Sequence, residues 1–252
     1  MKRRELLDLL FPPGLYCMCC DKIIDKSRPY NLCNECLAEF KWATGRCCIK
    51  CGKSLSERNP RDLCFSCAEN THVYNSGYSC SEYGMLEKSV IYKLKYGSET
   101  YIADVLGDII YDRLVSLVRI GEIEELSRAF DVIIPVPSHR GRKLERGYKQ
   151  AELIAERVSE LSGISMRKDI VERTSHTKAL RSLTPDARRA QLAGVFAVRS
   201  GREQLLEGRK ILLVDDIYTT CSTIDAVSTV LYAAGAACVD FVSFASGADV
   251  VK

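Results

Sequence analysis

Apolar residues in the last two thirds of the chain follow two kinds of pattern. Short continuous apolar runs, which predict buried strands, occur at 131–137, 193–198, 210–214 and 236–244. Apolar residues recur at helical spacing over 84–97, 101–118, 147–162 and 221–234. Strands that alternate with helices are typical of a mostly parallel sheet covered on both faces. The pattern therefore predicts an α/β fold with a doubly wound sheet, in which ligands bind at the carboxyl ends of the strands.

The first 70 residues follow a different pattern, which is set by pairs of cysteines. A Cys-x2-Cys pair, twelve residues and a second Cys-x2-Cys pair occur twice, and the second set lies 31 positions after the first. Four thiolates at this spacing are the usual ligands of a structural zinc ion. We predict one ion held by Cys17, Cys20, Cys33 and Cys36 and another held by Cys48, Cys51, Cys64 and Cys67. An interleaved assignment, in which each ion takes one pair from each set, is the alternative.

The polar, turn-rich residues 71–80 separate the two patterns. We therefore predict a zinc module over 1–70 and an α/β domain over 80–252. The chain has 13 cysteines, and because most of them lie between Cys17 and Cys80, they favour metal binding in a reducing compartment. No apolar run is long enough to span a membrane, and the opening MKRRELLDLLF is expected to form an amphipathic helix and not a signal peptide. We expect a cytoplasmic protein.

Positive charge is concentrated in the middle of the chain. The formal net charge is only +3, but residues 136–189 hold 13 Lys and Arg against 7 Asp and Glu. This excess indicates a polyanionic ligand, either a phosphorylated metabolite or nucleic acid. Charge alone does not choose between them.

The segment 211–223, ILLVDDIYTTCST, carries the strongest candidate site in the α/β part. An apolar strand leads into Asp215 and Asp216, and a hydroxyl-rich turn, Thr219–Thr223, precedes a helix. Backbone N–H groups at such a turn bind phosphate, and two neighbouring carboxylates can accept hydrogen bonds from two adjacent hydroxyls. A ribose 5-phosphate has both features.

Other sites also contain parts of this segment. A Walker B strand ends in acidic residues, but the chain has no GxxxxGK[ST] to accompany it. A receiver domain also has an acidic strand end, but it gives no role to the hydroxyl-rich turn. A surface turn with helix-capping residues is the remaining alternative.

The segment resembles the 5-phosphoribosyl 1-diphosphate (PRPP) binding motif of type I phosphoribosyltransferases, which is an apolar strand followed by DD and TTGxT. The resemblance implies that Asp215 and Asp216 hold the ribose hydroxyls and act in catalysis. It implies that Thr219, Thr220, Cys221, Ser222 and Thr223 surround the 5-phosphate. Cys221 stands where the family has glycine. If that position needs a positive φ, cysteine weakens phosphate binding, whereas a small side chain directed to solvent is harmless.

A basic loop is expected to bind the diphosphate of PRPP. It follows the strand at 131–137 and contains Arg140, Gly141, Arg142, Lys143 and Arg146. Mg2+ would bridge the diphosphate oxygens and offset charge as the diphosphate leaves. A solvated basic loop that leads into a helix is the alternative.

The motifs together resemble the ComF family. They are the paired cysteine module, PVP…RGYKQA at 135–151, the stretch RTSHTKALRSLTPDARRAQLAGVFAV at 173–198, and the DD motif. The resemblance implies a zinc module fused to a type I phosphoribosyltransferase-like domain, linked to natural competence and DNA uptake. Lys178 and Arg181 lie in a stretch that we expect to close over diphosphate as a flap, and they are the candidates for charge stabilisation.

Three functions remain open from the sequence. The first is Mg2+-dependent phosphoribosyl transfer to an unknown nitrogenous acceptor. The second is a non-catalytic competence factor that binds PRPP or a nucleotide and contacts single-stranded DNA or a protein partner. The third is an interaction scaffold with an inactive site. The intact acidic pair and hydroxyl-rich turn argue against the scaffold.

Overall fold

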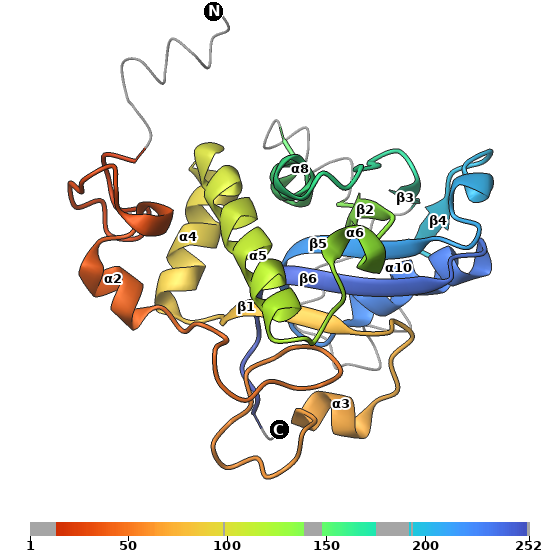
Figure 1. The fold of residues 1–252 in the computed structure, drawn as a ribbon, viewed down its shortest axis with the longest axis horizontal. Helices are drawn as coiled ribbons and strands as arrows, with labels where there is room; N and C mark the ends of the chain where they lie inside the picture. Colours follow the sequence, from red (N-terminus) through yellow and green to blue (C-terminus); the bar gives the residue numbers. More distant parts are fainter. Residues whose placement is uncertain (1–13, 98, 139–147, 175–191, 193, 251–252) are drawn as a thin grey trace, which may run out of the picture.

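A four-stranded parallel sheet forms the centre of the molecule in the computed structural model (Figure 1). The strands are β1 (Gly77–Glu82), β6 (Cys238–Ser246), β5 (Lys210–Tyr218) and β2 (Val132–Pro135), in that spatial order. All three strand pairs are parallel, which confirms the predicted sheet. The structure describes residues 14–97, 99–138, 148–174, 192 and 194–250.

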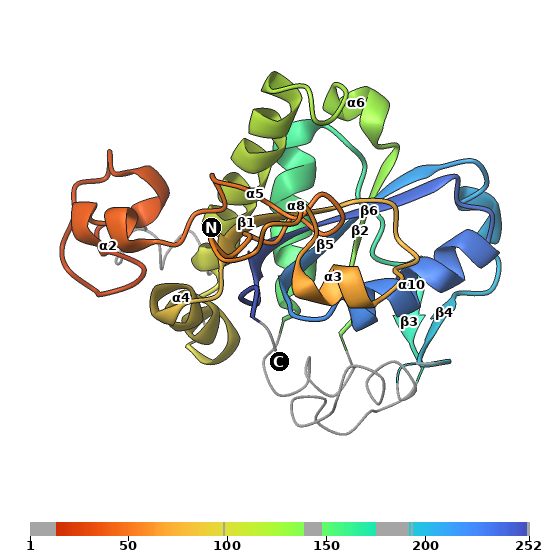
Figure 2. The same ribbon diagram turned by 90° about the horizontal axis from the view of Figure 1, so that it is seen from below.

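Helices cover both faces of the sheet, as the sequence predicts (Figures 1 and 2). One face packs against α4 (Met85–Tyr96), α5 (Tyr101–Arg119) and α8 (Gln150–Ser162), and the other packs against α10 (Ser222–Ala233). Successive residues of β5 alternate between the two cores, because side chains of a strand point to opposite faces. The predicted apolar stripe of α8, which includes Ile154, is buried.

Smaller elements complete the described chain. They are η1 (Pro29–Asn31), α2 (Asn34–Glu39), α3 (Phe65–Glu69), α6 (Leu126–Ala129), β3 (Val171–Arg173), β4 (Phe196–Val198) and η3 (Glu203–Leu205). The strand expected at 193–198 is the short β4, which pairs antiparallel with β3 outside the main sheet. No helix among the described residues has the length and apolarity needed to cross a membrane.

The sequence patterns missed β1. Its residues read GYSCSE, which is not an apolar run, and the first half falls in the segment predicted as a linker. Ser79 and Ser81 are nevertheless buried, because their hydroxyls donate to the carbonyls of Ser81 and Phe244. Local hydrogen bonds thus allow a polar strand at the edge of the sheet. The sheet begins at Gly77, three residues before the predicted start of the α/β domain.

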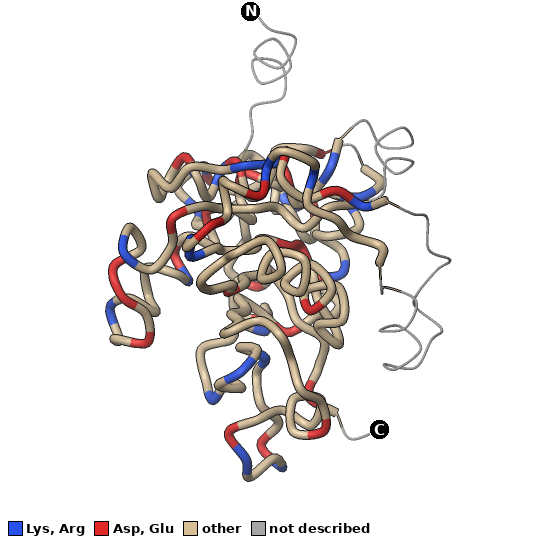
Figure 3. Tube along the Cα trace, turned by 90° about the vertical axis from the view of Figure 1, so that its right-hand side faces the viewer, with Lys and Arg blue, Asp and Glu red and all other residues tan. Residues whose placement is uncertain are grey.

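The two cysteine ribbons pack against opposite cores. Cys17 and Cys36 belong to the core on the side of α4 and α5, whereas Cys51 and Cys64 belong to the core on the side of α10. Charged residues of both signs are interspersed along the described chain (Figure 3). Most of the basic residues of 136–189 lie outside the described residues, so their binding of a polyanion stays a prediction.

Candidate functional site

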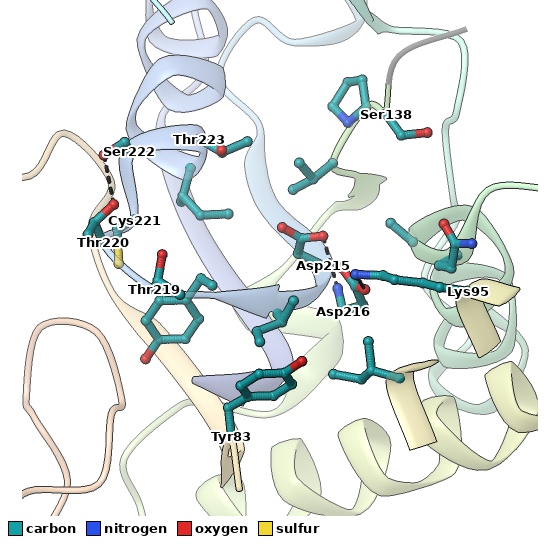
Figure 4. Close-up of a pocket in the computed structure, with 18 of the residues that line it drawn as sticks. Tyr83, Lys95, Ser138, Asp215, Asp216, Thr219, Thr220, Cys221, Ser222 and Thr223 are labelled. Carbon is teal, nitrogen blue, oxygen red and sulfur yellow. Dashed lines mark hydrogen bonds and ion pairs between the residues drawn. The ribbon is translucent and has the colours of Figure 1, made fainter. Parts of the chain in front are cut away.

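The two carboxylates of the DD motif lie inside β5, near its carboxyl end (Figure 4). The sequence predicted that the strand ends before them, but its backbone pairing with β6 continues to Tyr218. The backbone N–H of Asp216 donates to Oδ1 of Asp215 over 2.9 Å. The ammonium group of Lys95, from α4, forms an ion pair with the Asp216 carboxylate, which is only 8% exposed. Lys95 was not predicted, because nothing in the sequence links α4 to this strand.

Electrostatics distinguish the two acids. Burial raises the pKa of Asp215 well above the usual value, and the neighbouring Asp216 carboxylate raises it further. Lys95 and the Asp216 N–H oppose this rise in pKa. A ligand that donates hydrogen bonds to both carboxylates would favour their charged forms. The site is therefore suited to a pair of hydroxyl donors.

The hydroxyl-rich turn connects β5 to the first turn of α10. Cys221 is the residue before the helix, and its side chain makes no capping hydrogen bond. The first N–H groups of α10 therefore have no side-chain acceptor there, which suits an anion. The hydroxyls of Thr220 and Ser222 lie 2.9 Å apart and hydrogen-bond to each other. Both residues line the same cavity as Asp215 and Asp216 (Figure 4).

Cys221 has the backbone conformation that explains a glycine at this position in the motif. Its φ is 58° and its ψ is 3°, in the left-handed region. The side chain is only 4% exposed and packs in the core beside Cys51 and Tyr74. The position thus has the positive φ on which the sequence analysis made weaker phosphate binding conditional, and the side chain is not directed to solvent. The core accommodates the thiol beneath the turn.

The cavity has a volume of about 850 Å³ and lies at the carboxyl edge of the sheet. The turn and the acidic pair line one side, and residues 136–138 after β2 line another. Ser138 Oγ and Gln150 Nε2 are buried there and have no hydrogen-bond partner among the described residues. Buried polar atoms of this kind usually find a partner, so these two atoms are available to hydrogen-bond a ligand in the cavity. Gln150 ends the RGYKQ stretch, which was the sequence signal for it.

Aromatic side chains of α4 form a further wall of the cavity. Tyr92 and Tyr96 lie one helical turn apart, and their ring centroids are 4.8 Å apart. They are 61% and 56% exposed, and Lys88 lies one turn before them on the same wall. The sequence analysis missed this wall, although the spacing of 88, 92 and 96 could have indicated a common helix face.

Several predicted residues lie outside the described residues. They are the proposed diphosphate ligands Arg140, Gly141, Arg142, Lys143 and Arg146 and the proposed charge-stabilising residues Lys178 and Arg181. Their roles stay predictions. Just after the basic loop, Lys149 forms an ion pair with Glu152 on the same helix.

The eight predicted zinc ligands form two separate four-sulfur groups. Within each group all sulfur atoms lie within 4.8 Å of one another, and the grouping is the sequential one. The interleaved alternative is therefore wrong. Cys20 Sγ and Cys33 Sγ are 3.8 Å apart, and Cys51 Sγ and Cys64 Sγ are 3.7 Å apart. A tetrahedral zinc ion with bonds of about 2.3 Å requires sulfur separations of about 3.8 Å, so the residues fit this metal.

Backbone N–H groups support both groups in matching ways. Cys33 and Cys64 are the N-cap residues of α2 and α3, and each accepts a hydrogen bond at sulfur from the N–H three residues later. Such bonds stabilise thiolates, which are the form that binds metal. The two groups are thus equivalent locally and are suited to structural zinc.

Comparisons with known proteins bear on both parts of the chain. A family model described as "Double zinc ribbon domain" matches residues 6–68. "Competence protein F" of Haemophilus influenzae is 30% identical over 142 residues, which cover 56% of this chain and 60% of that protein. "DNA utilization protein YhgH" of Escherichia coli K12 is 27% identical over 150 residues, which cover 60% of this chain and 63% of that protein. The chain thus spans somewhat less than two thirds of these relatives.

Solved structures that resemble the chain include two phosphoribosyltransferases. The purine phosphoribosyltransferase of Pyrococcus horikoshii has a TM-score of 0.34 at 18% identity, over 58% of this chain and 78% of that one. The adenine phosphoribosyltransferase of Thermoanaerobacter pseudethanolicus has a TM-score of 0.34 at 15% identity, over 59% of this chain and 82% of that one. Scores of this size do not establish a shared function.

Proposed function

We propose that this chain, which belongs to the ComF family, binds PRPP or a related ribose phosphate at the carboxyl end of β5. The observation that carries the proposal is the shared cavity of the acidic pair Asp215–Asp216 and the turn Thr219–Thr223. In this assignment the carboxylates accept hydrogen bonds from the two ribose hydroxyls, and the turn with the start of α10 binds the 5-phosphate. In the absence of a ligand, the ion pair with Lys95 offsets the negative charge of the Asp216 carboxylate.

The proposal extends to phosphoribosyl transfer. Diphosphate would leave the anomeric carbon as a nitrogenous acceptor attacks it, and the departing charge needs cations. Arg140, Arg142, Lys143 and Arg146 are our candidates for binding diphosphate, and Lys178 and Arg181 are our candidates for offsetting the charge. Mg2+ is expected to arrive with PRPP, and no residue is assigned to it here. The acidic pair would keep the ribose ring in place during the transfer.

A second candidate function is the binding of a nucleotide or a single strand of DNA without turnover. The exposed pair Tyr92–Tyr96, with Lys88 beside it, supports this function, because bases stack on aromatic rings and phosphates attract lysine. The names of these two relatives refer to competence and DNA utilization. We propose that the ligand site serves DNA uptake or use, in a reducing compartment such as the cytoplasm.

Calorimetry with zinc-loaded protein tests the proposal. PRPP with Mg2+, and ribose 5-phosphate without it, are titrated into wild type and into the double variant Asp215→Asn, Asp216→Asn. We expect both ligands to bind wild type and both to lose at least tenfold in affinity in the double variant. Asp169→Asn, which affects an ion pair with Arg202 outside the cavity, is the matched control and should bind normally. Equal affinity in all three proteins would rule out the acidic pair as the ribose site.

Diphosphate release separates the two candidate functions. If the protein is a transferase, wild type should release diphosphate from PRPP when a cell extract that contains bases and nucleosides is added. The double variant should then release none. A binding protein should retain PRPP intact and bind single-stranded DNA with an affinity that falls steeply with salt.

A further inference from the structure

The second cysteine group, Cys48, Cys51, Cys64 and Cys67, lies directly beneath the hydroxyl-rich turn Thr219–Thr223. The hydroxyl of Tyr218 donates to the backbone carbonyl of Cys51 over 2.6 Å. The ammonium group of Lys53, which is only 4% exposed, donates to the backbone carbonyl of Thr219 over 3.2 Å. Tyr218, the last residue of β5, and Thr219, the first residue of the turn, are thus hydrogen-bonded to the segment Cys48–Lys53 (the second knuckle), which carries two of the four sulfur ligands.

Packing strengthens this connection. The Cys221 thiol, under the turn, is buried beside the Cys51 side chain, and the rings of Tyr74 and Tyr218 both contact Phe241 edge-on at about 5 Å. Gly52, with φ of 74°, presses against β1, and a Cβ there would lie 2.5 Å from the Gly77 carbonyl oxygen. The knuckle is therefore enclosed between β1 and the turn.

The first cysteine group contacts α4 and α5, whereas the second contacts the turn. The hydroxyl of Tyr30 donates to Asp112 of α5 over 2.7 Å, and the Ser89 hydroxyl of α4 donates to the Cys19 carbonyl over 3.4 Å. Its ligands Cys17 and Cys36 belong to the core on the opposite face of the sheet from Tyr218 and Cys221. The two groups are alike locally but differ in what they support.

We propose that the second cysteine group is a positioning element of the ligand site, so that metal in this group and an anionic ligand at the turn bind with positive coupling. The inference rests on the proposed function for the identity of the ligand. A metal orders the knuckle, because four-cysteine modules of this size depend on their ion to fold. The ordered knuckle holds Tyr218, Thr219 and Cys221 in the ligand-binding conformation. Since coupling is reciprocal, the ligand must also raise metal affinity at this group.

Competition for zinc measures the coupling. Zinc-loaded protein is equilibrated with a chromogenic chelator, with and without ribose 5-phosphate at about one hundred times its dissociation constant. We expect one of the two ions to become at least tenfold harder to remove when the ligand is present, and the other to change less than twofold. Equal changes for both ions, or none for either in protein that binds the ligand, would overturn the proposal.

Two tyrosines provide matched variants. Tyr218→Phe removes the hydrogen bond to the second knuckle, and Tyr30→Phe removes the corresponding phenol bond of the first ribbon. Tyr218→Phe should weaken ribose 5-phosphate binding about fivefold, reduce the effect of the ligand on zinc retention and leave the zinc content at two ions. Tyr30→Phe should bind the ligand as wild type does. Equal loss in both variants would indicate a general effect on folding.

Hydrogen exchange tests the coupling without a ligand. Cys33→Ser removes a metal-binding sulfur from the first group, and Cys64→Ser removes the corresponding sulfur from the second. Both cysteines are N-cap residues of short helices. We expect Cys64→Ser to speed exchange in a peptide covering 218–224, and Cys33→Ser to leave that peptide unchanged. If Cys64→Ser does not fold, Tyr218→Phe takes its place in the comparison. Failure of wild type to bind ribose 5-phosphate would refute the proposed function, whereas unchanged exchange would refute the positioning role.

Discussion

Asp215 and Asp216 show at the scale of single residues how the candidate site lowers stability. Only Asp216 pairs directly with Lys95, and the pKa of Asp215 is raised by burial and by the adjacent carboxylate. A carboxyl group whose pKa is raised in the folded state lowers the free energy of unfolding once the pH exceeds its unfolded pKa. Functional sites commonly contain such residues, because a bound ligand later compensates for the loss.

Asp215→Asn should therefore stabilise the ligand-free protein at pH 7 while weakening ligand binding. The amide keeps an oxygen to accept the Asp216 N–H but carries no charge. We expect thermal unfolding to occur a few degrees above wild type at pH 7. The difference should shrink as the pH falls below the raised pKa of Asp215, since the wild-type carboxyl is then protonated too. A lower unfolding temperature at pH 7 would contradict the assignment.

The left-handed conformation of Cys221 gives a second residue-scale prediction. A β-branched residue is strained at a φ of 58°, by roughly 1–2 kcal/mol or more, whereas glycine adopts it freely. Cys221→Val should thus reduce ribose 5-phosphate affinity about tenfold, and Cys221→Gly should keep it within about threefold of wild type. Calorimetry checks both values. Equal affinities for the two variants would mean that this φ does not matter for phosphate binding.

Helices α5 and α8 set the close packing on one face of the sheet. At Gly107 of α5 an added Cβ would lie 2.5 Å from Cβ of Arg157 in α8. Arg157 in turn donates to Asp108 over 2.7 Å, which holds the two helices in register. The small residue at 107 therefore allows the separation that places α8, and with it Gln150, at the cavity.

Gly107→Ala should destabilise the fold by about 1–3 kcal/mol through overpacking, although alanine favours helix. The control is Gly45→Ala, because no atom lies within 4 Å of the Cβ that it adds. Chemical denaturation of zinc-loaded proteins measures the difference. If Gly107→Ala were as stable as Gly45→Ala, the helices would have to separate without cost.

Helix α4 contributes both a cation and an aromatic wall to the cavity. Tyr92→Leu and Tyr96→Leu should each weaken a nucleoside 5′-monophosphate on the order of tenfold, because base stacking is worth about 1–3 kcal/mol. Ribose 5-phosphate, which has no base, should bind these variants as it binds wild type. Met85→Leu is the control, because Met85 is the first residue of the same helix and is 90% exposed. An equal loss for both ligands would assign the tyrosines a structural role.

The whole molecule depends on the cysteine ribbons to cover its sheet. One four-cysteine group belongs to each core, and Asp249, near the described C-terminal end, accepts hydrogen bonds from Ser56, Asn59 and Phe65 of the second ribbon. The division into a zinc module at 1–70 and an α/β domain at 80–252 stays a prediction. Contacts of this kind argue that the two parts fold together.

A fragment of residues 80–252 should therefore not reach the native state. It lacks the first half of β1 and exposes apolar surface on both faces of the sheet. We expect it to lack cooperative thermal unfolding, whereas the zinc-loaded full chain unfolds cooperatively. Strong chelation of the full chain should also lower the temperature of its single transition. A fragment with a cooperative transition like that of the full chain would establish an independent domain.

The sequence by itself determined those features whose parts are neighbours along the chain. Each cysteine group is built from two local pairs, so the spacing favoured Cys17–Cys36 and Cys48–Cys67 as separate groups, and the structure decided against the interleaved assignment. The strand, acidic pair and hydroxyl-rich turn of 211–223 are also local, and the helix after them positions the turn. Apolar patterns of strands and helices that alternate along the chain predicted the parallel sheet, because a helix between two strands covers one face of the sheet that they form.

Only the tertiary structure decided which distant residues meet at the site. Lys95 reaches Asp216 across more than 120 positions of sequence, and Cys51 accepts a hydrogen bond from Tyr218 across more than 160. Such contacts leave no periodic signal, because they depend on how helices and ribbons pack on the sheet. The polar strand β1 escaped prediction for a related reason, since its buried serines are satisfied by hydrogen bonds that form only in the assembled sheet.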